Sequence, residues 1–406
     1  MNKLTKILIT ILIILSLNYN IVKAEEFTIT SKKVVLYNLN DNNIIYEQDK
    51  DKKVQIASLT KIMTTIVAIE NIDNLDKEVT ITWDMFKGIE EYSKAGFQIG
   101  DIVTYKDLLY GIMLPSGADA VNAIVLSIKN NEEEFVSLMN NKAQELNLTN
   151  THFDNPIGMD SAGDDLTNYS TANDLANLLL YALKNDTFKE IFTTRTYTVP
   201  STKLVLKSTL TTYSAYSNLD VSNIKGAKSG FTDGAGLCLA SISTINDVDY
   251  LLINLGSSTN NKANAVKDSL TLYNYYSSNY SYKEVLKKGQ IITTIPVKWS
   301  TIKEYGITSP STKELYLKND IDLNKIEYNY QGLTELTPKI KKDTKLGTIE
   351  IKYDDKILDT VDIYLTENIK YSHIFIYIII ILLILLIIFT KKRRKKHIKR
   401  KIKSKK

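Results

Sequence analysis

The segment ASLTKIMT, residues 57–64, places a serine and a lysine three positions apart at the start of a periodic apolar stretch. Apolar side chains recur at the spacing of one helix face, at Leu59, Ile62, Met63, Ile66 and Val67. Residues three apart on a helix have Cβ atoms about 5–6 Å apart, so the amine of Lys61 can reach the hydroxyl of Ser58. The first helical turn also leaves backbone N–H groups unpaired, which suits an oxyanion. The segment predicts a serine nucleophile with a lysine base, although taken alone it also fits an N-cap serine beside a solvated lysine.

The Ser-x-x-Lys spacing occurs at two other places, and the context of each argues against a catalytic pair. Ser222 and Lys225 precede Gly226, where a helix is not expected. Ser300 and Lys303 lie in a β-rich stretch. The pair at positions 58 and 61 is therefore the one that opens a predicted helix.

Two further patterns follow the first along the chain. PSGAD, residues 115–119, interrupts two apolar helical stretches, and Lys228-Ser229-Gly230 immediately precedes a predicted strand. Ser116 lies 58 residues after Ser58, and Lys228 lies 112 residues after Ser116. Together the three patterns give the order S-x-x-K, S-x-x and K-[ST]-G, which is close to the motif set of penicillin-binding proteins and β-lactamases.

On these motifs the sequence resembles the low-molecular-weight penicillin-binding proteins that act as serine-type D-alanyl-D-alanine carboxypeptidases. The resemblance covers most of the chain and includes residues 57–64, 107–111, 114–117, 151–158, 169–172 and 226–232. It implies an α+β fold: a β-lactamase-like catalytic domain with an antiparallel sheet and helices, a small all-β domain, and a C-terminal transmembrane helix. It also implies two kinds of ligand, namely peptidoglycan stem peptides ending in D-Ala-D-Ala and β-lactam antibiotics as inhibitors.

The resemblance assigns catalytic roles to three residues. Ser58 would attack the carbonyl of the penultimate D-Ala, form an acyl-enzyme and release the terminal D-Ala. Lys61 would take the serine proton, which requires a neutral amine near pH 7; burial and the charge of Lys228 would both lower its pKa. Ser116 would pass a proton between Lys61 and the leaving amine.

The resemblance also assigns substrate-binding roles to the third motif, Lys228-Ser229-Gly230, and to the next residue, Phe231. Lys228 and the Ser229 hydroxyl would hold the terminal carboxylate of the substrate. The backbone N–H groups of Ser58 and Phe231 would form the oxyanion hole.

The second motif departs from the family pattern at its third position. Ala118 stands where the family usually has Asn, whose amide contacts both the lysine and the substrate. We expect activity to survive, because the two serines and two lysines of the motifs remain. Ser229 replaces the commoner Thr and keeps the hydroxyl.

Cysteine and histidine are scarce, which limits metal and triad chemistry. The single cysteine, Cys238, excludes a disulfide framework and a cysteine-based zinc cage. Of three histidines, His397 lies in a basic tail and His373 adjoins an apolar run, so only His152 could serve a Ser-His-Asp triad. We expect His152 instead to fix its turn-rich loop by hydrogen bonding. No metal and no organic cofactor is predicted.

Two other functions remain open at this stage. A β-lactamase of the class A type needs a Glu to activate the deacylating water, and no Glu occurs from Asn150 to Asn168. A catalytically weak wall-binding protein is motivated by Ala118 and the β domain. The residues do not separate hydrolysis from transpeptidation.

The two ends of the chain carry targeting signals. Residues 1–24 combine Lys3 and Lys6 with an apolar run and small residues before a cleavage point, which predicts a signal peptide. Residues 371–390 are mostly Ile and Leu and are long enough for a transmembrane anchor. The basic tail, residues 391–406, would stay in the cytoplasm by the positive-inside rule, so the body would lie outside the membrane, with lipid as a partner.

The charge distribution supports this division and excludes one class of function. The chain has 51 Lys and Arg against 46 Asp and Glu, but 15 of the basic residues lie in residues 1–24 and 391–406. The body, residues 25–370, therefore keeps 36 basic residues against all 46 acids. A body with a net negative charge lacks the basic surface that binds nucleic-acid phosphates, so nucleic-acid binding is not predicted.

Within the body, the hydrophobic pattern predicts two domains. Residues 25–283 mix helical spacing with short β-rich runs, including a hairpin of 34–37 with 44–46 and neighbouring strands at 237–242 and 250–255. Residues 284–368 lack a helical period and predict a small β domain with strands at 291–297, 313–317, 326–330 and 348–353.

Overall fold

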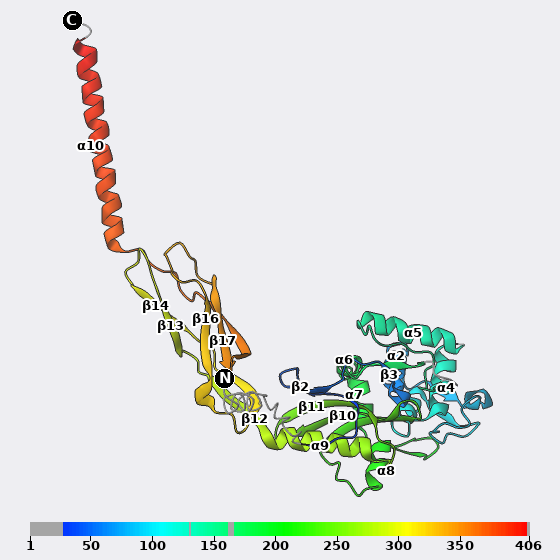
Figure 1. The fold of residues 1–406 in the computed structure, drawn as a ribbon. Helices are drawn as coiled ribbons and strands as arrows, with labels where there is room; N and C mark the ends of the chain where they lie inside the picture. The colour runs from blue at the N-terminus through cyan, green and yellow to red at the C-terminus, as the bar shows by residue number, and fades with distance from the viewer. Residues whose placement is uncertain (1–26, 130, 161–165, 404–406) are drawn as a thin grey trace, which may run out of the picture. The chain divides into compact units, whose positions relative to one another are not determined.

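The chain divides into two compact units, residues 1–278 and 279–406 (Figure 1). The structure, a computed structural model, describes residues 27–129, 131–160 and 166–403. The predicted signal peptide, residues 1–24, lies outside the described residues. The two units are described separately below.

A five-stranded antiparallel sheet forms the centre of the first unit. Its strands are β1 (Lys33–Asn38), β2 (Asn43–Gln48), β9 (Ile224–Thr232), β10 (Gly236–Ile245) and β11 (Val248–Ser257), in the order β2-β1-β11-β10-β9. The predicted hairpin is confirmed as β1 with β2, and the second predicted pair as β10 with β11. Strand β9, which carries the third motif, lies at one edge of this sheet.

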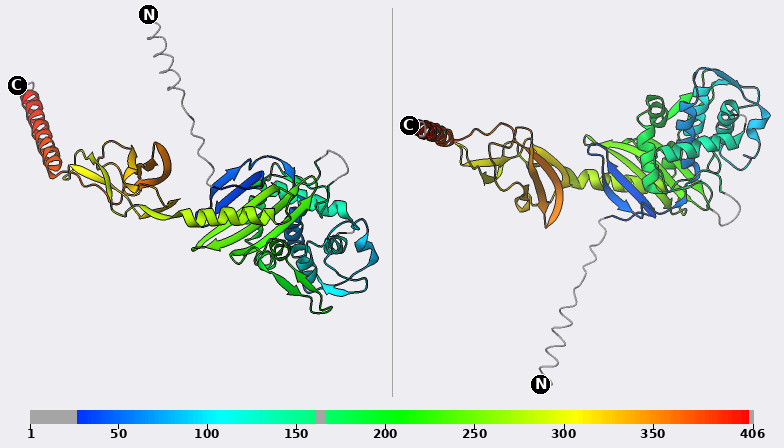
Figure 2. Two further views of the ribbon diagram at one scale, coloured as in Figure 1. Left: turned by 60° about the horizontal axis from the view of Figure 1, so that its bottom comes forward. Right: turned by 90° about the horizontal axis from the view of Figure 1, so that it is seen from above.

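Helices cover both faces of the sheet, and its central strands carry apolar side chains on both faces. Val35, Leu251 and Ile253 belong to the large core that the sheet shares with the helices. On the other face, α9 (Asn264–Asn279) brings the ring of Tyr273 to 5.9 Å from that of Tyr250, between centroids. Figure 2 shows α9 lying across the sheet. The alternation of side chains along a strand explains why β11 contributes to both layers.

The remaining elements of the first unit form a mostly helical half. Its helices are η1 (Ala57–Leu59), α2 (Thr60–Glu70), η2 (Trp83–Phe86), α3 (Tyr105–Met113), α4 (Ala118–Ile128), α5 (Glu132–Glu145), α6 (Ala172–Ala182), α7 (Asp186–Thr193) and α8 (Thr209–Ala215). Three short strand pairs complete it: β3 (Val54–Gln55) with β6 (Tyr169–Ser170), β4 (Glu78–Thr80) with β5 (Ile102–Thr104), and β7 (Thr196–Thr198) with β8 (Val205–Lys207). Residues 60–68 of α2 are all buried, which makes α2 the central helix.

Helix α3 begins at a pair of reciprocal hydrogen bonds between Thr104 and Asp107. The Thr104 hydroxyl accepts a hydrogen bond from the Asp107 N–H at 3.1 Å, and the Asp107 carboxylate accepts one from the Thr104 N–H at 2.8 Å. This reciprocal cap fixes the start of α3. Apolar residues at helical spacing around Leu108, Leu175 and Leu272 lie in α3, α6 and α9.

The second unit contains antiparallel strand pairs and one long helix. Its elements are β12 (Tyr280–Leu286), β13 (Ile291–Pro296), β14 (Glu304–Thr308), β15 (Lys313–Lys318), η3 (Leu323–Lys325), β16 (Glu327–Gly332), β17 (Lys345–Tyr353), β18 (Lys356–Tyr364) and α10 (His373–Lys403). Strand β12 pairs with β15, β13 with β14, and β16 with β17, which also pairs with β18. Ile307, Leu336, Ile349 and Leu365 are fully buried in its core. The four predicted strands of this region are confirmed, while the predicted domain boundary at residue 284 stays a prediction.

The C-terminal helix α10 contains the predicted anchor, except for its first two residues. In the part of the chain that the structure describes, no helix is both long enough and apolar enough to span a membrane. The predicted span also includes Phe375 and Ile376, whose side chains lie outside that description.

Candidate active site

Ser58 lies in the single turn η1, immediately before α2. Its predecessor, Ala57, has a φ of +47°, a left-handed conformation that is costly for a residue with a Cβ. Gly158 fits against this turn, because a Cβ added to it would lie 2.1 Å from the Ala57 carbonyl oxygen. The backbone is therefore held in an unusual shape at the residue before the serine, as is common where a side chain must be positioned for chemistry.

Lys61 and Ser58 meet as the spacing predicts. The Lys61 Nζ donates to the Ser58 Oγ at 3.0 Å and to the Ile157 carbonyl oxygen at 2.6 Å. The lysine is 1% exposed, and burial lowers its pKa to about 7, against an opposing effect of Asp119. A substantial fraction of Lys61 is therefore neutral near pH 7 and can accept a proton from the serine. The alternative of a solvated lysine is wrong.

The second and third motifs meet behind this pair. Ser116 lies in the turn between α3 and α4 with a φ of +65°, and its Oγ accepts a hydrogen bond from the Lys228 Nζ at 2.8 Å. Lys228 also donates to the Ser229 carbonyl oxygen at 2.7 Å and is completely buried. Burial first, and then the charge of Lys61, hold the pKa of Lys228 well below its usual value.

Burial is the main cause of the lowered pKa of Lys61, and the repulsion between the Lys61 and Lys228 charges lowers the pKa of Lys228. In addition, Lys228 points into the protein interior rather than into solvent, so its amine reaches the Ser116 hydroxyl first. The Ser229 hydroxyl remains the more accessible donor of the third motif.

The turn that holds Ser116 is packed against residues 93–96. The Asp119 carboxylate accepts hydrogen bonds from the backbone N–H of Ala95 at 2.7 Å and of Gly96 at 3.1 Å. Ala118, the departure from the family pattern, is fully buried at the start of α4, and its N–H donates to the Ser93 carbonyl at 2.8 Å. The residue thus keeps its backbone role in the turn while supplying no side-chain amide.

Strand β9 brings the third motif close to the serine. A Cβ added to Gly230 would lie 3.1 Å from the Ser58 backbone nitrogen, so a glycine here gives the strand its close approach. The following residue, Phe231, is 46% exposed beside the same pocket. The sequence-predicted pair of oxyanion donors, at Ser58 and Phe231, therefore lies on two neighbouring segments.

Thr209 is a functional candidate that the sequence analysis missed. Its hydroxyl lies 2.7 Å from the Ser229 hydroxyl, and both side chains line the pocket that contains Ser58. Thr209 begins α8, and no sequence motif marks it. Only the packing of α8 beside β9 reveals a pair of hydroxyls that suits a carboxylate.

These residues surround one cavity of about 190 Å³, called here the active-site pocket. It is lined by Ser58, Lys61, Glu91, Tyr92, Ser93, Ser116, Gly158, Thr209, Tyr213, Ser229, Gly230, Phe231 and Thr232. Six of the seven predicted site residues line it, and the seventh, Lys228, is bonded to the lining residue Ser116. Residues 91–93 and Tyr213 were not predicted, because they come from segments without a distinctive motif.

A pair of buried asparagines shapes the loop opposite Lys61. The Asn155 Oδ1 accepts hydrogen bonds from the N–H groups of Ile157, Gly158 and Met159 at 3.2, 2.7 and 3.0 Å. Asn168 donates to the Asn155 carbonyl at 2.7 Å. This network holds the Ile157 carbonyl where Lys61 reaches it.

His152 does not join the serine. Its Nε2 lies 3.2 Å from the Asp154 carboxylate, and its backbone pairs with Tyr169. It is not among the residues that line the active-site pocket. The interactions of His152 fix its own loop, as expected. In the described ranges, no group of three His, Cys, Asp or Glu residues could hold a metal ion.

Comparison with protein families matches both units. Residues 19–259 match the family described as D-alanyl-D-alanine carboxypeptidase, and residues 280–371 match the C-terminal domain of penicillin-binding protein 5. The D-alanyl-D-alanine carboxypeptidase DacF of Bacillus subtilis is 27% identical over 355 residues, covering 86% of this chain and 88% of that protein. The D-alanyl-D-alanine carboxypeptidase of Streptomyces sp. strain K15 is 34% identical over 212 residues, covering 49% of this chain and 72% of that protein.

Solved structures show the same fold. Penicillin-binding protein 5 of Haemophilus influenzae superimposes with a TM-score of 0.63 at 22% identity, covering 84% of this chain and 98% of that one. The Streptomyces K15 DD-transpeptidase superimposes with a TM-score of 0.55 at 30% identity, covering 61% of this chain and 97% of that one.

Proposed function

The chain belongs to the D-alanyl-D-alanine carboxypeptidase family, and on that premise we propose that Ser58, Lys61 and Ser116 remove the terminal D-Ala from peptidoglycan stem peptides. The observation that carries this proposal is the contact between the Lys61 amine and the Ser58 hydroxyl, 3.0 Å apart, with the amine buried. A buried lysine with a pKa of about 7 is the base that a serine nucleophile needs.

The proposed reaction has two steps. Ser58 attacks the carbonyl of the penultimate D-Ala while Lys61 takes the hydroxyl proton, and the scissile C–N bond then breaks as the leaving amine gains a proton through Ser116. Water attacks the resulting ester and restores the serine. The same ester forms with a β-lactam, whose leaving group stays attached, so these antibiotics act as inhibitors.

Substrate is held by the neighbouring segments. The hydroxyls of Ser229 and Thr209 lie together at the pocket and can donate to the terminal carboxylate, while the buried Lys228 amine donates to Ser116. The backbone N–H groups of Ser58 and Phe231 stabilise the oxyanion, and Gly230 keeps them close.

Labelled penicillin and a D-Ala-D-Ala peptide test this function on the purified protein. Wild type should take up one label per chain, lose it only slowly, and release D-Ala from the peptide, and Ser58→Ala should neither bind the label nor release D-Ala. Ser222→Ala is the matched control, because Ser222 has the same Ser-x-x-Lys spacing but is exposed outside the pocket. Rapid penicillin turnover would indicate a β-lactamase, and an absence of both label and D-Ala release would indicate a wall-binding protein.

Transpeptidation is a second activity of the same site. It is motivated by the Streptomyces K15 protein of similar fold, which is named a DD-transpeptidase. Adding an amine acceptor during D-Ala release separates the two outcomes: a transpeptidase gives a new peptide bond, and a carboxypeptidase gives only the shortened peptide.

We propose further that the chain is exported and anchored by residues 371–390, with the tail 391–406 in the cytoplasm. Two observations support this: the apolar run is followed directly by a basic tail, and the apolar side chains of α10 from Ile378 to Ile388 are exposed. A buried core helix would hide these side chains.

Cysteine labelling in intact cells tests this topology. In a Cys238→Ala background, a membrane-impermeant maleimide should label Ser311→Cys but not Lys396→Cys until the cells are lysed. Labelling of both positions in intact cells, or of neither, would contradict the proposed orientation.

A further inference from the structure

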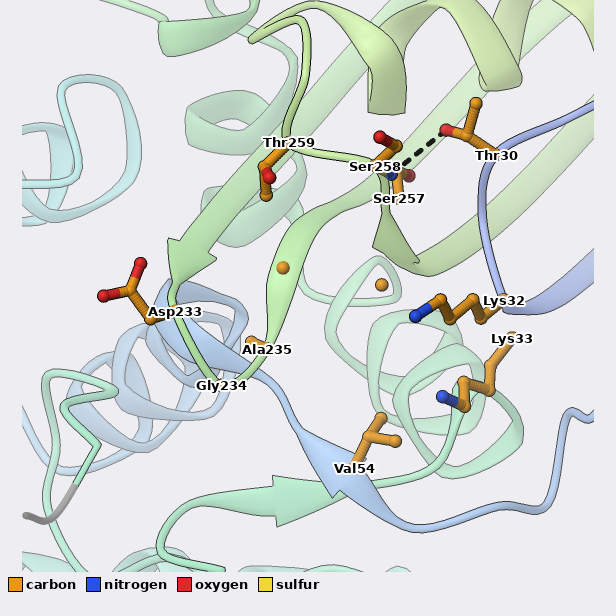
Figure 3. Close-up of a pocket in the computed structure, with 12 residues that line it drawn as sticks. Thr30, Lys32, Lys33, Val54, Asp233, Gly234, Ala235, Ser257, Ser258 and Thr259 are labelled. Carbon is orange, nitrogen blue, oxygen red and sulfur yellow. Dashed lines mark hydrogen bonds between the residues drawn. The ribbon is translucent and has the colours of Figure 1, made fainter. Parts of the chain in front are cut away.

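A second cavity, of about 390 Å³, lies at the end of the central sheet (Figure 3). It is lined by the segment that leads into β1, by the turn between β9 and β10, and by the end of β11. We call it the lysine pocket and define it by Thr30, Lys32, Lys33, the turn 233–236 and residues 256–259. None of the catalytic motifs lines it.

The side chains of Lys32 and Lys33 reach into the lysine pocket (Figure 3). In Figure 3 the side chains of Lys32 and Lys33 extend side by side from the strand into the cavity. Among the described residues, neither amine has a hydrogen bond or an ion pair. Burial lowers the pKa of Lys33, and the charges of Lys52 and Lys32 lower it further, against a smaller opposing effect of Asp49. The one carboxylate that lines the cavity, Asp233, lies on the opposite wall and points away from the lysines (Figure 3).

The rest of the pocket wall consists of glycines, which leave space, and of residues with hydroxyl groups. Gly236 and Gly256 have φ values of +69° and +67°, and a Cβ added to Gly256 would lie 3.6 Å from the Lys32 side chain. Ser257, Ser258 and Thr259 line the same space, and the Ser257 hydroxyl is already hydrogen-bonded to that of Ser31. Two lysine amines, the hydroxyl-bearing residues Ser258 and Thr259, and two glycines that leave space in the wall together suit the binding of an oxyanion.

We propose that the lysine pocket binds a carboxylate or phosphate group. An anion would relieve the repulsion between the two amines and would give each a charge-assisted hydrogen bond. The group could belong to the cell-wall substrate or to a free anion. The hairpin of β9 and β10 connects the two pockets, because Phe231 and Thr232 line the active-site pocket and residues 233–236 line the lysine pocket. This connection favours a group of the bound substrate as the anion. That assignment rests on the proposed function, whereas anion binding does not.

Calorimetric titration of the full chain with inorganic phosphate, at constant ionic strength, tests the binding itself. Wild type should bind saturably, and a double variant, Lys32→Ala with Lys33→Ala, should bind at least about tenfold more weakly. Lys184→Ala with Lys225→Ala is the control, because both lysines are exposed in the same unit and line neither pocket. A lack of saturable binding, or equal weakening in both double variants, would overturn the proposal.

A kinetic measurement identifies the source of the anion. D-Ala release is compared between a peptide with a free side-chain carboxylate and the same peptide with that group amidated. A preference for the acidic peptide that disappears in the Lys32/Lys33 variant assigns the group to the substrate, while phosphate binding without such a preference assigns it to a free anion. If no variant releases D-Ala, the proposed function fails, and the phosphate titration still decides the pocket.

A different observation carries a second inference, at the start of α10. The loop of residues 297–303, called here the Trp299 loop, holds Trp299 and Ile302 with 45% and 44% of their surface exposed. The Trp299 carbonyl accepts a hydrogen bond from the Ser372 N–H at 2.9 Å, and Ser300 pairs with Tyr371, which is 47% exposed. The loop is therefore tied to the residues that lead directly into α10.

The Trp299 loop has the composition of a membrane-interface contact. Trp299 has a φ of +58°, an unfavourable conformation for a bulky residue, and it still presents its ring to solvent. The Lys339 amine lies 5.8 Å from the centre of that ring. Tryptophan and tyrosine favour the headgroup level of a bilayer, where lysines also contact anionic lipid. We propose that the Trp299 loop rests in the lipid headgroup layer beside the anchor, which rests on the proposed anchoring of α10.

Tryptophan fluorescence tests this contact, because the chain has only two tryptophans, Trp83 and Trp299. The full chain with Trp83→Phe is reconstituted in phosphatidylglycerol vesicles, with and without brominated acyl chains. Strong quenching and a blue shift are expected, and both should be absent in the matched Trp299→Phe protein. A chain that stays with the vesicles while Trp299 is not quenched would overturn the contact; a chain that does not associate with vesicles would instead refute the anchor.

Discussion

The pH dependence of acylation follows directly from the burial of Lys61. With a pKa of about 7, the neutral fraction of this amine rises about tenfold between pH 6 and pH 8. An unperturbed lysine would instead be almost fully protonated over this range, and the neutral fraction would keep rising tenfold per pH unit up to about pH 10. The rate constant for acylation by penicillin should therefore rise through pH 7 and level off above about pH 8.

Stopped-flow measurement of penicillin acylation between pH 5.5 and 9 checks this profile. The His152→Ala variant is the control, because His152 does not line the active-site pocket and its loss should leave the profile unchanged. A rate that continues to rise to pH 9 would show that burial does not lower the pKa of Lys61. A rate that is flat from pH 6 to 8 would show that its neutral amine is not the base.

The same shift predicts how stability depends on pH. The folded-state pKa of Lys61 lies about 3.5 units below the ordinary value of 10.5, so the unfolded chain binds more protons between pH 7 and 10.5. The resulting cost, about 4–5 kcal/mol, is fully present below pH 7 and is lost as the pH rises toward 10.5. Replacing Lys61→Met should abolish acylation but raise the free energy of unfolding at pH 7 by about 2–3 kcal/mol, after the lost hydrogen bonds are counted. A destabilised Lys61→Met protein would refute the assigned burial cost.

Other positions give further tests. Gly158→Ala should prevent stable folding or acylation, because its Cβ would lie 2.1 Å from the Ala57 carbonyl oxygen; Gly88→Ala, with a φ of +73° but no atom within 4 Å, should cost only about 1 kcal/mol by thermal unfolding. Asn155→Ala leaves two buried N–H groups and a partly buried one without their acceptor and should lower the unfolding free energy in urea by about 2–3 kcal/mol, with slower acylation; an unchanged urea midpoint would contradict this. Thr209→Val should raise KM for D-Ala-D-Ala peptides about tenfold in a steady-state assay and leave unfolding unchanged, whereas an unchanged KM would remove Thr209 from the carboxylate site.

The sequence alone predicted a serine nucleophile, a lysine base and the division of the chain into a mixed part and a β-rich part. These features depend on local spacing: three residues on a helix bring Lys61 to Ser58, and alternating apolar residues predict strands such as β10 and β11. The motif order also carried the family, because three short patterns at long separations rarely coincide by chance.

Only the tertiary structure decided which groups surround the serine and what charge they carry. Thr209 and residues 91–93 reach the active-site pocket, and Asn155 shapes the loop beside Lys61, through packing between segments far apart in sequence that no local pattern marks. The structure also showed that Lys228 is buried, with its amine bonded to the Ser116 hydroxyl, and that burial is the main cause of the lowered pKa of Lys61. Burial is a property of the whole fold, so the desolvation that lowers the pKa of Lys61 could be expected from the sequence, but its source is seen only in the folded chain.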